Sequence, residues 1–285
     1  MSSDIKTTFS FEVFPPRKDM PVDVIYNTLD QLSDLNPDFI SVTCGAGGTS
    51  ANASDRMLAI ADAIKNKYHK ISVAHMPCIN LSKDDAADIL NKLDNLGVHN
   101  ILALRGDRVP NVEPKEDFLH AVDLIKFIRQ KTGSKFKIYA ACYPEGHTEA
   151  PDLDTDLNYL KEKVDSGVDG LISQLFFDNE NYYYFLDKVQ RLGINLPIEA
   201  GIMPVTNKKQ IERMVNLCGA NLPVKFRYIL DKYGDDSDSL REAGIVYALN
   251  QIVDLLAHGV DGIHLYVMNN IYVARRISEA IYKLL

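Results

Sequence analysis

The stretch KIYAACYPEGHTEAPDLDTDLNYLKEKVDSGVDGLISQLFF (137–177) contains the repeating pattern that decides the fold. It begins with a short apolar run, KIYAACY (137–143), and ends with another, GLISQLFF (170–177). Between them, LDTDLNYLKEKVDSG (153–167) places apolar residues at intervals of three and four, with charges on the other face, which is typical of an amphipathic helix. This pattern runs into Gly167, where a left-handed helix C-cap belongs. The stretch therefore predicts one strand–helix–strand unit.

The same alternation runs along the whole chain of 285 residues. Strands this continuously apolar cannot have one face in water, so they indicate a parallel sheet covered by helices. Eight such strands favour closure into a barrel, and we therefore predict an α/β fold, a (β/α)8 TIM barrel, over an open doubly wound sheet. The predicted strands span residues 9–14, 39–44, 71–76, 100–106, 137–143, 170–177, 197–203 and 262–268, and the glycines that follow helical patterns are Gly97, Gly133, Gly167, Gly193, Gly219 and Gly259.

We predict a single catalytic domain over residues 1–285. Residues 221–259 interrupt the alternation of one strand with one helix, because they contain one short and one long helical pattern before the last strand. We interpret this segment as a helical insertion and not as a second domain. No Pro/Gly/Ser-rich linker, low-complexity tract or internal repeat divides the sequence.

The composition is that of an ordinary soluble protein and argues against several functional classes. The 31 basic and 39 acidic residues give a net charge of −8, whereas a protein that binds nucleic acid or an anionic membrane needs clustered Lys and Arg. No apolar stretch approaches ~18 residues and the first residues contain no hydrophobic signal core, so we expect a cytoplasmic protein. The four cysteines form no CxxC pair, which argues against a disulfide framework, an iron–sulfur cluster or a structural zinc site.

Polar residues gather at the predicted carboxyl ends of the strands, where the chemistry of such barrels lies. Along the first strand, alternation places Ser10, Glu12 and Phe14 on one face, so we expect Glu12 to point into the barrel. Desolvation there favours the protonated carboxyl group that a general acid needs, unless an Arg or Lys pairs with it. Structural polar residues scattered at random would not align in this way, so a site is predicted at this end. The aligned residues are Glu12, Thr43, His75, Asp107, Tyr143, His147 and Gln174.

Other kinds of site fit this pattern less well. The loop GAGGTS (45–50) lacks the last glycine of a dinucleotide fingerprint and the lysine of a P-loop, so we interpret it as a flexible active-site loop. No lysine ends a strand, as a Schiff-base aldolase requires, and no GxSxG is present. The histidines and carboxylates could in principle bind a metal, but the compact HxH pair is missing, and no metal is predicted. We interpret Cys44 and Cys142 as buried thiols and not as nucleophiles.

In their order along the chain, the strand-end motifs resemble those of the methylenetetrahydrofolate reductases. These are flavin enzymes with a (β/α)8 barrel that reduce 5,10-methylenetetrahydrofolate to 5-methyltetrahydrofolate. The resemblance extends from the first strand to the last, and its motifs are specific as a set although each alone is weak. The matching stretches are FEVFPPR (11–17), SVTCGAGGT (41–49), AHMPC (74–78), ALRGD (103–107), YPEGH (143–147), QLFFD (174–178), GIMPVTN (201–207) and HLYVMN (264–269).

The resemblance implies FAD as the cofactor and a ping-pong transfer of hydride through flavin N5, with NADH, NADPH or a reductase partner as the source of electrons. Glu12 then matches the acid that protonates the folate, and Asp107 matches the aspartate beside the flavin and the pterin. Gln174 and Gln210 match folate contacts. The positions that match FAD contacts are Thr43, His75, Leu104, Arg105, Gly106, Asp107, Tyr143, His147, Asp156 and Lys163.

The sequence departs from the family pattern at a few of these places. Cys44 stands where a Tyr is common after the strand-two Thr. On the FAD-contacting helix, Tyr159 and Glu162 replace an amide and a basic residue. Asn270 replaces an Arg that addresses the folate tail, which weakens the case for the usual recognition of the glutamate tail.

Two alternatives therefore stay open at the level of sequence. One is a flavin- or folate-binding barrel subunit that needs an electron-transfer partner, and the other is a flavin-free hydrolase or lyase that uses Glu12 and Asp107. The resemblance also implies a homo-oligomer in one-carbon metabolism. Because the chain ends just past the eighth barrel helix, we expect no S-adenosylmethionine-binding domain of the eukaryotic kind and no inhibition by that ligand.

Overall fold

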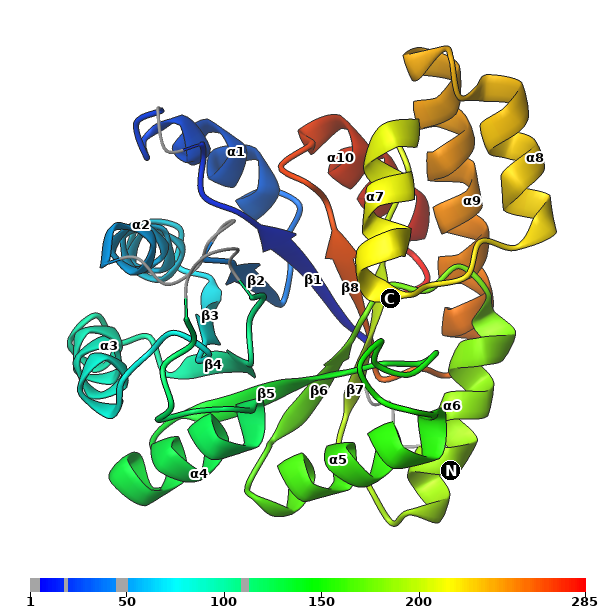
Figure 1. Ribbon diagram of the computed structural model, residues 1–285. Helices are drawn as coiled ribbons and strands as arrows, with labels where there is room; N and C mark the ends of the chain where they lie inside the picture. The colour runs from blue at the N-terminus through cyan, green and yellow to red at the C-terminus, as the bar shows by residue number, and fades with distance from the viewer. Residues whose placement is uncertain (1–5, 18–19, 45–50, 109–112) are drawn as a thin grey trace. The chain divides into compact units, whose positions relative to one another are not determined.

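The computed structural model describes residues 6–17, 20–44, 51–108 and 113–285. Its strands pair in the order β1-β2-β3-β4-β5-β6-β7-β8 and form a closed barrel, and every pairing whose register is resolved is parallel (Figure 1). The predicted (β/α)8 barrel is thus confirmed. The strands are β1 (Thr8–Val13), β2 (Phe39–Val42), β3 (Ile71–Pro77), β4 (Asn100–Leu104), β5 (Lys137–Cys142), β6 (Gly170–Ser173), β7 (Ile198–Ile202) and β8 (Gly262–Tyr266).

Helices connect these strands, and two of them occupy the segment in which the sequence predicts a helical insertion. The helices are α1 (Val24–Ser33), α2 (Ala51–Asp62) with its π-helical continuation η1 (Ala63–Lys67), α3 (Lys83–Asn95), α4 (Ala121–Thr132), α5 (Leu153–Asp165), α6 (Asn179–Arg191), α7 (Lys208–Cys218), α8 (Val224–Tyr233), α9 (Ser237–Ala257) and α10 (Ile271–Ile281). All six glycines predicted to end helical patterns have positive φ, between 60° and 108°. Among the described residues, none of these helices has the length and apolarity needed to cross a membrane.

The contacts of the chain divide it into two compact units. The β1–β5 unit comprises Ser10–Ala141 and Glu162–Leu171, and the β7–β8 unit comprises Met1–Phe9, Cys142–Lys161 and Ile172–Leu285. That the whole chain acts as one domain stays a prediction.

In the β1–β5 unit, alternation along the strands separates an apolar face from a polar one. Phe11, Val13, Ile40 and Val42 are fully buried, and α2, α3 and α4 lie on the outer side of β2 to β4 (Figure 1). The residues between them in sequence, such as Glu12, belong to the opposite face. The apolar strand residues thus pack against the helices, and the alternate residues of each strand point to the interior of the barrel.

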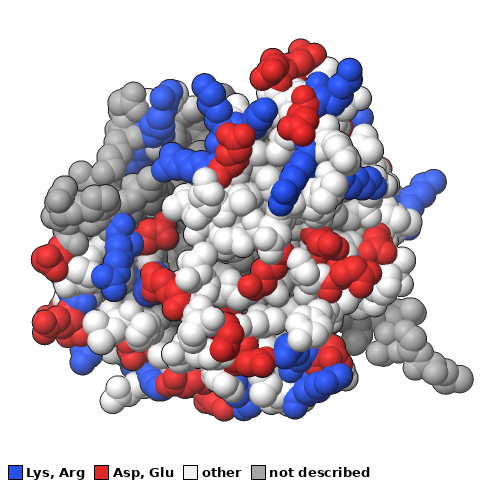
Figure 2. Space-filling model, turned by 45° about the vertical axis from the view of Figure 1, so that its right-hand side comes forward, with Lys and Arg blue, Asp and Glu red and all other residues white. Residues whose placement is uncertain are grey.

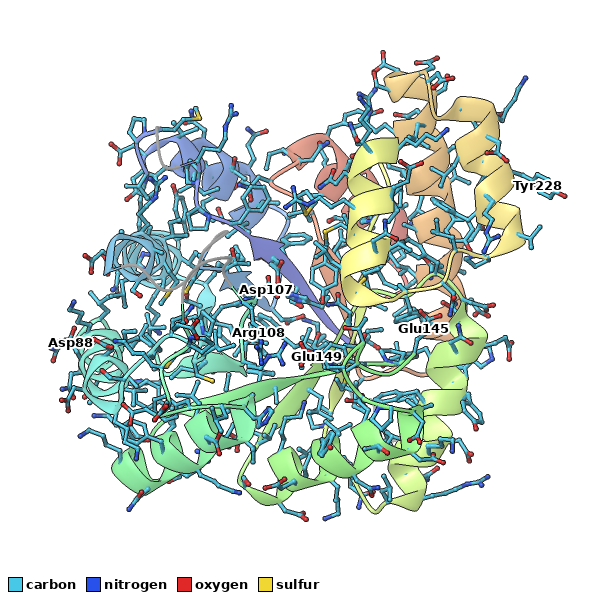
Figure 3. The ribbon with its side chains drawn as sticks, viewed as in Figure 1. Asp88, Asp107, Arg108, Glu145, Glu149 and Tyr228 are labelled. Carbon is cyan, nitrogen blue, oxygen red and sulfur yellow. The ribbon has the colours of Figure 1, made fainter. Side chains whose placement is uncertain are left out.

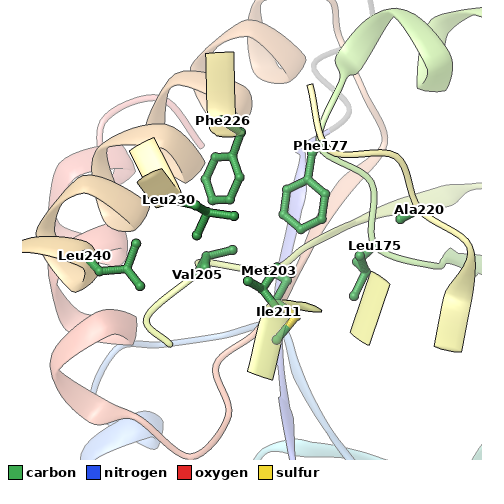
Figure 4. Packing of buried hydrophobic residues seen from close by; sticks show 9 residues of the cluster. All are labelled: Leu175, Phe177, Met203, Val205, Ile211, Ala220, Phe226, Leu230 and Leu240. Carbon is green, nitrogen blue, oxygen red and sulfur yellow. The ribbon is translucent and has the colours of Figure 1, made fainter. Parts of the chain in front are cut away.

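The β7–β8 unit contains an apolar cluster that anchors the extra helices (Figure 4). Phe177, just past β6, stacks on Phe226 of α8 with ring centroids 5.4 Å apart. Tyr247 of α9 packs edge-on against Phe226 and donates a hydrogen bond to the Phe177 carbonyl oxygen at 2.7 Å. The predicted strand 170–177 was therefore too long, because β6 ends at Ser173 and the apolar residues after it serve this cluster.

On the face shown in Figure 2, basic and acidic side chains lie next to one another over much of the surface. Ion pairs such as Lys188–Asp154 and Arg191–Asp187 join charged side chains of neighbouring positions in the β7–β8 unit. Exposed pairs of this kind contribute little to stability, about 0–1 kcal/mol each. The fold therefore depends mainly on the apolar packing described above.

Gly244 of α9 offers a test of that packing, because a Cβ at this position would lie 1.8 Å from the carbonyl oxygen of Val205. Helix propensity alone would make Gly244→Ala stabilising by about 1 kcal/mol. We expect the opposite sign, a loss of about 2 kcal/mol or more and a lower melting temperature, because the helix must move off the backbone. Val246→Ala, at an exposed site on the same helix, is the control and should change little. A stabilised Gly244→Ala variant would contradict this packing.

Candidate active site

Glu12 lies inside the β1–β5 unit next to a histidine. Its Oε2 is 3.5 Å from His75 Nε2, and the two side chains are only 18% and 7% exposed. Strand register explains the contact, since Glu12 pairs with Ser41 and Ser41 pairs with Val73, two residues before His75. The small Ser41 side chain on the intervening strand leaves room for the two larger groups to meet. Glu12 points inward as predicted, and among the described residues one ionisable group next to it is the His75 imidazole.

The Glu12–His75 pair can store a proton in a desolvated place without a net charge. A protonated carboxyl group can donate to a neutral imidazole nitrogen, whereas an imidazolium would favour the ionised carboxylate. In either arrangement the two side chains together carry one dissociable proton. The pair is therefore chemically suited to deliver a proton to a bound ligand.

The chain leaving β1 is held by an arginine of α2. Arg56 Nη2 donates to the carbonyl oxygens of Pro16, Arg17 and Met20 at 2.7, 3.1 and 3.2 Å. Two consecutive prolines cannot continue the strand ladder, so this segment lacks the usual backbone partners. The guanidinium replaces them and fixes the loop that follows Glu12.

The residues that follow β2 form hydrogen bonds with the ends of β1 and β3. The backbone N–H of Thr43 donates to Val13 O at 3.0 Å, and the thiol of Cys44 donates to His75 O at 3.2 Å. Thr43 is half-buried and Cys44 is buried. The glycine-rich segment predicted as a flexible loop, 45–50, lies outside the described residues.

The β4 end has a backbone geometry that only glycine tolerates. Gly106 has φ +86°, and a Cβ there would lie 2.8 Å from Pro77 Cβ. Arg105 O accepts a hydrogen bond from Ile79 N at 2.8 Å, so the segment lies tightly along the end of β3. Leu104 and Arg105 are half-buried at this end.

Asp107 and Arg108 follow directly, and both are exposed (Figure 3). An exposed carboxylate on a loop anchored by Gly106 can reach a bound molecule without any change in the core. The position predicted for Asp107, at the carboxyl end of the fourth strand, is confirmed.

The loop after β5 contains Tyr143 and His147. A turn at Pro144 is closed by Gly146 N donating to Tyr143 O at 3.0 Å, with Gly146 at φ +84°. The Tyr143 and His147 rings meet edge-on, with centroids 4.7 Å apart. His147 Nδ1 lies 3.1 Å from the backbone N–H of Glu149, which can only donate. His147 is thus held in the neutral tautomer whose hydrogen is on Nε2, a donor suited to a polar ligand.

Along α5, two predicted cofactor contacts have different surroundings. Asp156, in the first turn, is buried. Lys163, near the end of the helix, donates to Ala141 O at 2.6 Å and is half-buried. Glu162, which stands where the family has a basic residue, pairs with Lys126 of α4 at 2.8 Å. The family departure at Glu162 therefore serves a surface contact between two helices.

Both predicted folate contacts are half-buried glutamines in the β7–β8 unit. Gln174 Oε1 accepts from Leu175 N at 2.9 Å, which leaves its amide NH2 end as the donor. Gln210 lies in the first turn of α7, and its backbone N–H donates to the capping Asn207 Oδ1 at 2.9 Å. The Gln174 side chain is thus held by its chain neighbour, whereas for Gln210 it is the backbone that is held, by the helix cap.

Tyr266 is a residue that the sequence pattern does not single out. Its hydroxyl donates to Ser173 O at 2.7 Å, and its half-buried ring crosses Gly201 of β7. A Cβ at Gly201 would lie 2.8 Å from this ring and 2.2 Å from Ser173 O, so only glycine leaves space for the tyrosine. The available signal was the glycine within the apolar strand run 197–203, which indicates close approach of another group.

The loop after β8 uses Asn270 for its own backbone. Asn270 Oδ1 accepts from Val273 N at 3.2 Å and caps α10, while Met268 and Asn269 have positive φ of 50° and 55°. Asn is a favoured N-cap residue, whereas arginine cannot accept this bond. The substitution of the family arginine thus exchanges a positive charge for a helix cap.

Comparison with known proteins identifies the family of this chain. The family described as methylenetetrahydrofolate reductase matches residues 2–282. The chain belongs to the methylenetetrahydrofolate reductase family. The resemblance seen in the strand-end motifs is thereby confirmed.

Relatives in the family match most of this chain. The 5,10-methylenetetrahydrofolate reductase of Escherichia coli K12 is 34% identical over 272 residues, which cover 95% of this chain and 90% of that protein. Methylenetetrahydrofolate reductase (NADH) 1 of Arabidopsis thaliana is 35% identical over 277 residues. That match covers 93% of this chain and 46% of the plant protein, so the chain spans about half the length of its plant relative.

Solved structures with low sequence identity share the fold. A Clostridium thermocellum protein, described as binding two copies of 5-methyl-5,6,7,8-tetrahydrofolic acid, matches with a TM-score of 0.68 at 13% identity, covering 97% of this chain and 98% of that one. A 2,3-dimethylmalate lyase matches with a TM-score of 0.56 at 12% identity, covering 99% and 82%. At these identities the likeness concerns the barrel alone.

Among the residues that the structure describes, no group of three or more His, Cys, Asp or Glu side chains is placed to hold a metal ion. The cysteines near the site are buried, and burial raises the pKa of Cys44 and of Cys78 to about 12. Neither forms an appreciable amount of thiolate, the form needed for a nucleophile or a metal ligand.

Alkylation of the native protein tests this conclusion. With a pKa near 12, only roughly one thiol in ten thousand is ionised at pH 8, so we expect Cys44 and Cys78 to react with iodoacetamide at least about 100-fold more slowly than glutathione. Peptide mapping by mass spectrometry measures each site. In denaturant all four cysteines should react alike, which serves as the control. Rapid modification of native Cys44 would show that its thiol is activated.

Proposed function

We propose that this protein reduces 5,10-methylenetetrahydrofolate to 5-methyltetrahydrofolate with FAD as its cofactor. The observation that carries the proposal is the desolvated Glu12, held 3.5 Å from His75 at the position of the family's acid. The names of the relatives support the substrate and the product. NADH or NADPH is proposed as the electron donor, with a separate reductase as the other possible source.

Each unit supplies groups that could hold parts of an FAD molecule. In the β1–β5 unit, Arg105 and Lys163 carry positive charge, and in the β7–β8 unit His147 presents an Nε2–H donor. From their family positions we also assign Thr43, His75, Leu104, Asp107, Tyr143 and Asp156 as FAD contacts. When bound, FAD supplies the stored hydride that links the two halves of a ping-pong cycle.

The protein's own part in the chemistry is the handling of a proton and of charge. Glu12, in its protonated form, gives its proton to the five-membered ring of the folate, which opens to an electrophilic iminium cation. His75 keeps that proton available in the interior. Asp107, as a carboxylate, stabilises the positive charge that develops on the folate, while Gln174 and Gln210 hold the pterin by hydrogen bonds. We further propose a cytoplasmic homo-oligomer that acts in one-carbon metabolism.

The first test is the colour of the purified protein. We expect a yellow preparation that absorbs near about 450 nm, as flavins do, and that bleaches when NADH or NADPH is added without oxygen. Colourless protein that FAD does not restore would favour a flavin-free hydrolase or lyase. Bound flavin that neither nucleotide reduces, but that a reductase partner does, would identify a subunit dependent on that partner.

The second test is Glu12→Gln, which keeps the shape of the side chain and its contact with His75 but removes the acidic proton. We expect reduction of the flavin by the donor to change less than twofold, while reduction of the folate falls by about two orders of magnitude. Stopped-flow spectroscopy follows the two half-reactions separately. Glu116→Gln, which removes an exposed carboxylate, is the matched control. Equal losses in both half-reactions would refute the role of Glu12.

A further inference from the structure

Glu145 is a half-buried carboxylate whose two oxygens both accept hydrogen bonds. Oε2 accepts the backbone N–H of Asn221 at 2.8 Å. Oε1 accepts the side-chain amide of Asn181 and, at 3.5 Å, that of Asn221. A carboxylate with several donors in a partly desolvated place is a strong local tie, because charge-assisted hydrogen bonds are about twice as strong as neutral ones.

The three residues of this tie come from three separate segments of the β7–β8 unit. Glu145 lies in the loop after β5, between Tyr143 and His147. Asn181 lies in the first turn of α6, and Asn221 follows the end of α7 by three residues. The carboxylate thus joins the loop to one helix start and one helix end.

A second contact joins the same loop to the end of α7. Gly219, which caps α7 with φ +72°, has Thr148 of the loop so close that a Cβ would lie 2.7 Å from Thr148 Cγ2. The loop therefore touches the helix end at two places, through Glu145 and through Thr148. These two contacts couple the position of α7 to that of the loop. Because Gln210 lies at the other end of α7, a shift of the loop would also shift Gln210.

The neutral form of Glu145 is well tolerated by its surroundings. Burial raises its pKa above the usual value, and the nearby Asp178 acts in the same direction, while the donors from Asn221 and Asn181 lower it. A raised pKa in the folded state means that ionisation costs stability as the pH rises through it. An uncharged glutamine of the same shape should therefore fold at least as well at neutral pH.

We propose that Glu145 is a positioning residue that fixes the loop of Tyr143 and His147 relative to α6 and α7. This role rests on the proposed function, in which the loop contacts FAD and Gln210 of α7 contacts the folate. Both Glu145 oxygens accept hydrogen bonds from Asn181 and Asn221, so we assign it no direct ligand contact. It acts by holding the loop of Tyr143 and His147 and the helix α7 in a fixed position relative to each other.

The test compares three variants of the full-length protein. Glu145→Ala removes every bond of the tie. Glu145→Gln keeps both main bonds, because its oxygen accepts from Asn221 N–H and Asn181 can turn its amide to accept from the new NH2 group. Glu180→Ala, which removes an exposed carboxylate next to Asn181, is the matched control.

The first measurement is hydrogen exchange of the protein without FAD, followed by mass spectrometry. For Glu145→Ala we expect exchange to rise about tenfold or more in the peptides that contain 143–150 and 219–223, and to stay unchanged in β1–β4. The second measurement is the affinity of the apoprotein for FAD, for which we expect an increase in Kd of about tenfold. Glu145→Gln should restore both values to within about threefold, and Glu180→Ala should change neither.

The outcomes separate this role from the alternatives. If Glu145→Ala exchanges and binds FAD like the unmodified protein, no positioning role exists. If exchange rises but FAD affinity is unchanged, Glu145 serves the fold only, and the proposal is overturned as well. If Glu145→Ala does not fold, Asn181→Ala replaces it with the same two measurements. Failure of the unmodified protein to bind FAD refutes the proposed function itself, and with it the role in FAD binding, while hydrogen exchange still reports on the tie.

Discussion

The parallel pairing of neighbouring strands is the constraint on which the site depends. In the β1–β5 unit, register alone brings Glu12 of β1 and His75 of β3 together across the small Ser41 of β2. No loop is needed to create this contact. Because parallel strands share the direction of their carboxyl ends, each further strand adds its last residues to the same edge. Loops then hold these residues in place, as Arg56 does for the segment after β1.

The sequence predicts well whatever depends on neighbours along the chain. Alternation located the strands and the inward direction of Glu12, and glycines such as Gly219 located helix ends. It predicts poorly whatever depends on contacts between distant segments. The run 170–177 is apolar for two different reasons, a strand and then a cluster with α8, and periodicity does not distinguish them. The pairing of Glu145 with Asn221, 76 residues away, leaves no local pattern at all.

Family resemblance suggests roles for single residues, and the structure shows how some of these residues are held in place. His147 is not only present but held in one tautomer by a backbone N–H. Gly106 and Gly201 are required by close approach of Pro77 and Tyr266, which a list of polar motifs does not reveal. Residues that leave space are thus as much a part of the site as residues that make contacts.

The acidic net charge of −8 makes the local placement of cations decisive for a protein proposed to bind two polyanions. Lys163 donates to the Ala141 carbonyl oxygen, so its charge is fixed in position. Asn270 has instead become the cap of α10 and brings no charge to the loop after β8. The two strained residues before it, Met268 and Asn269, keep that loop in one shape. At this loop the chain thus presents a neutral helix cap where the family has an arginine.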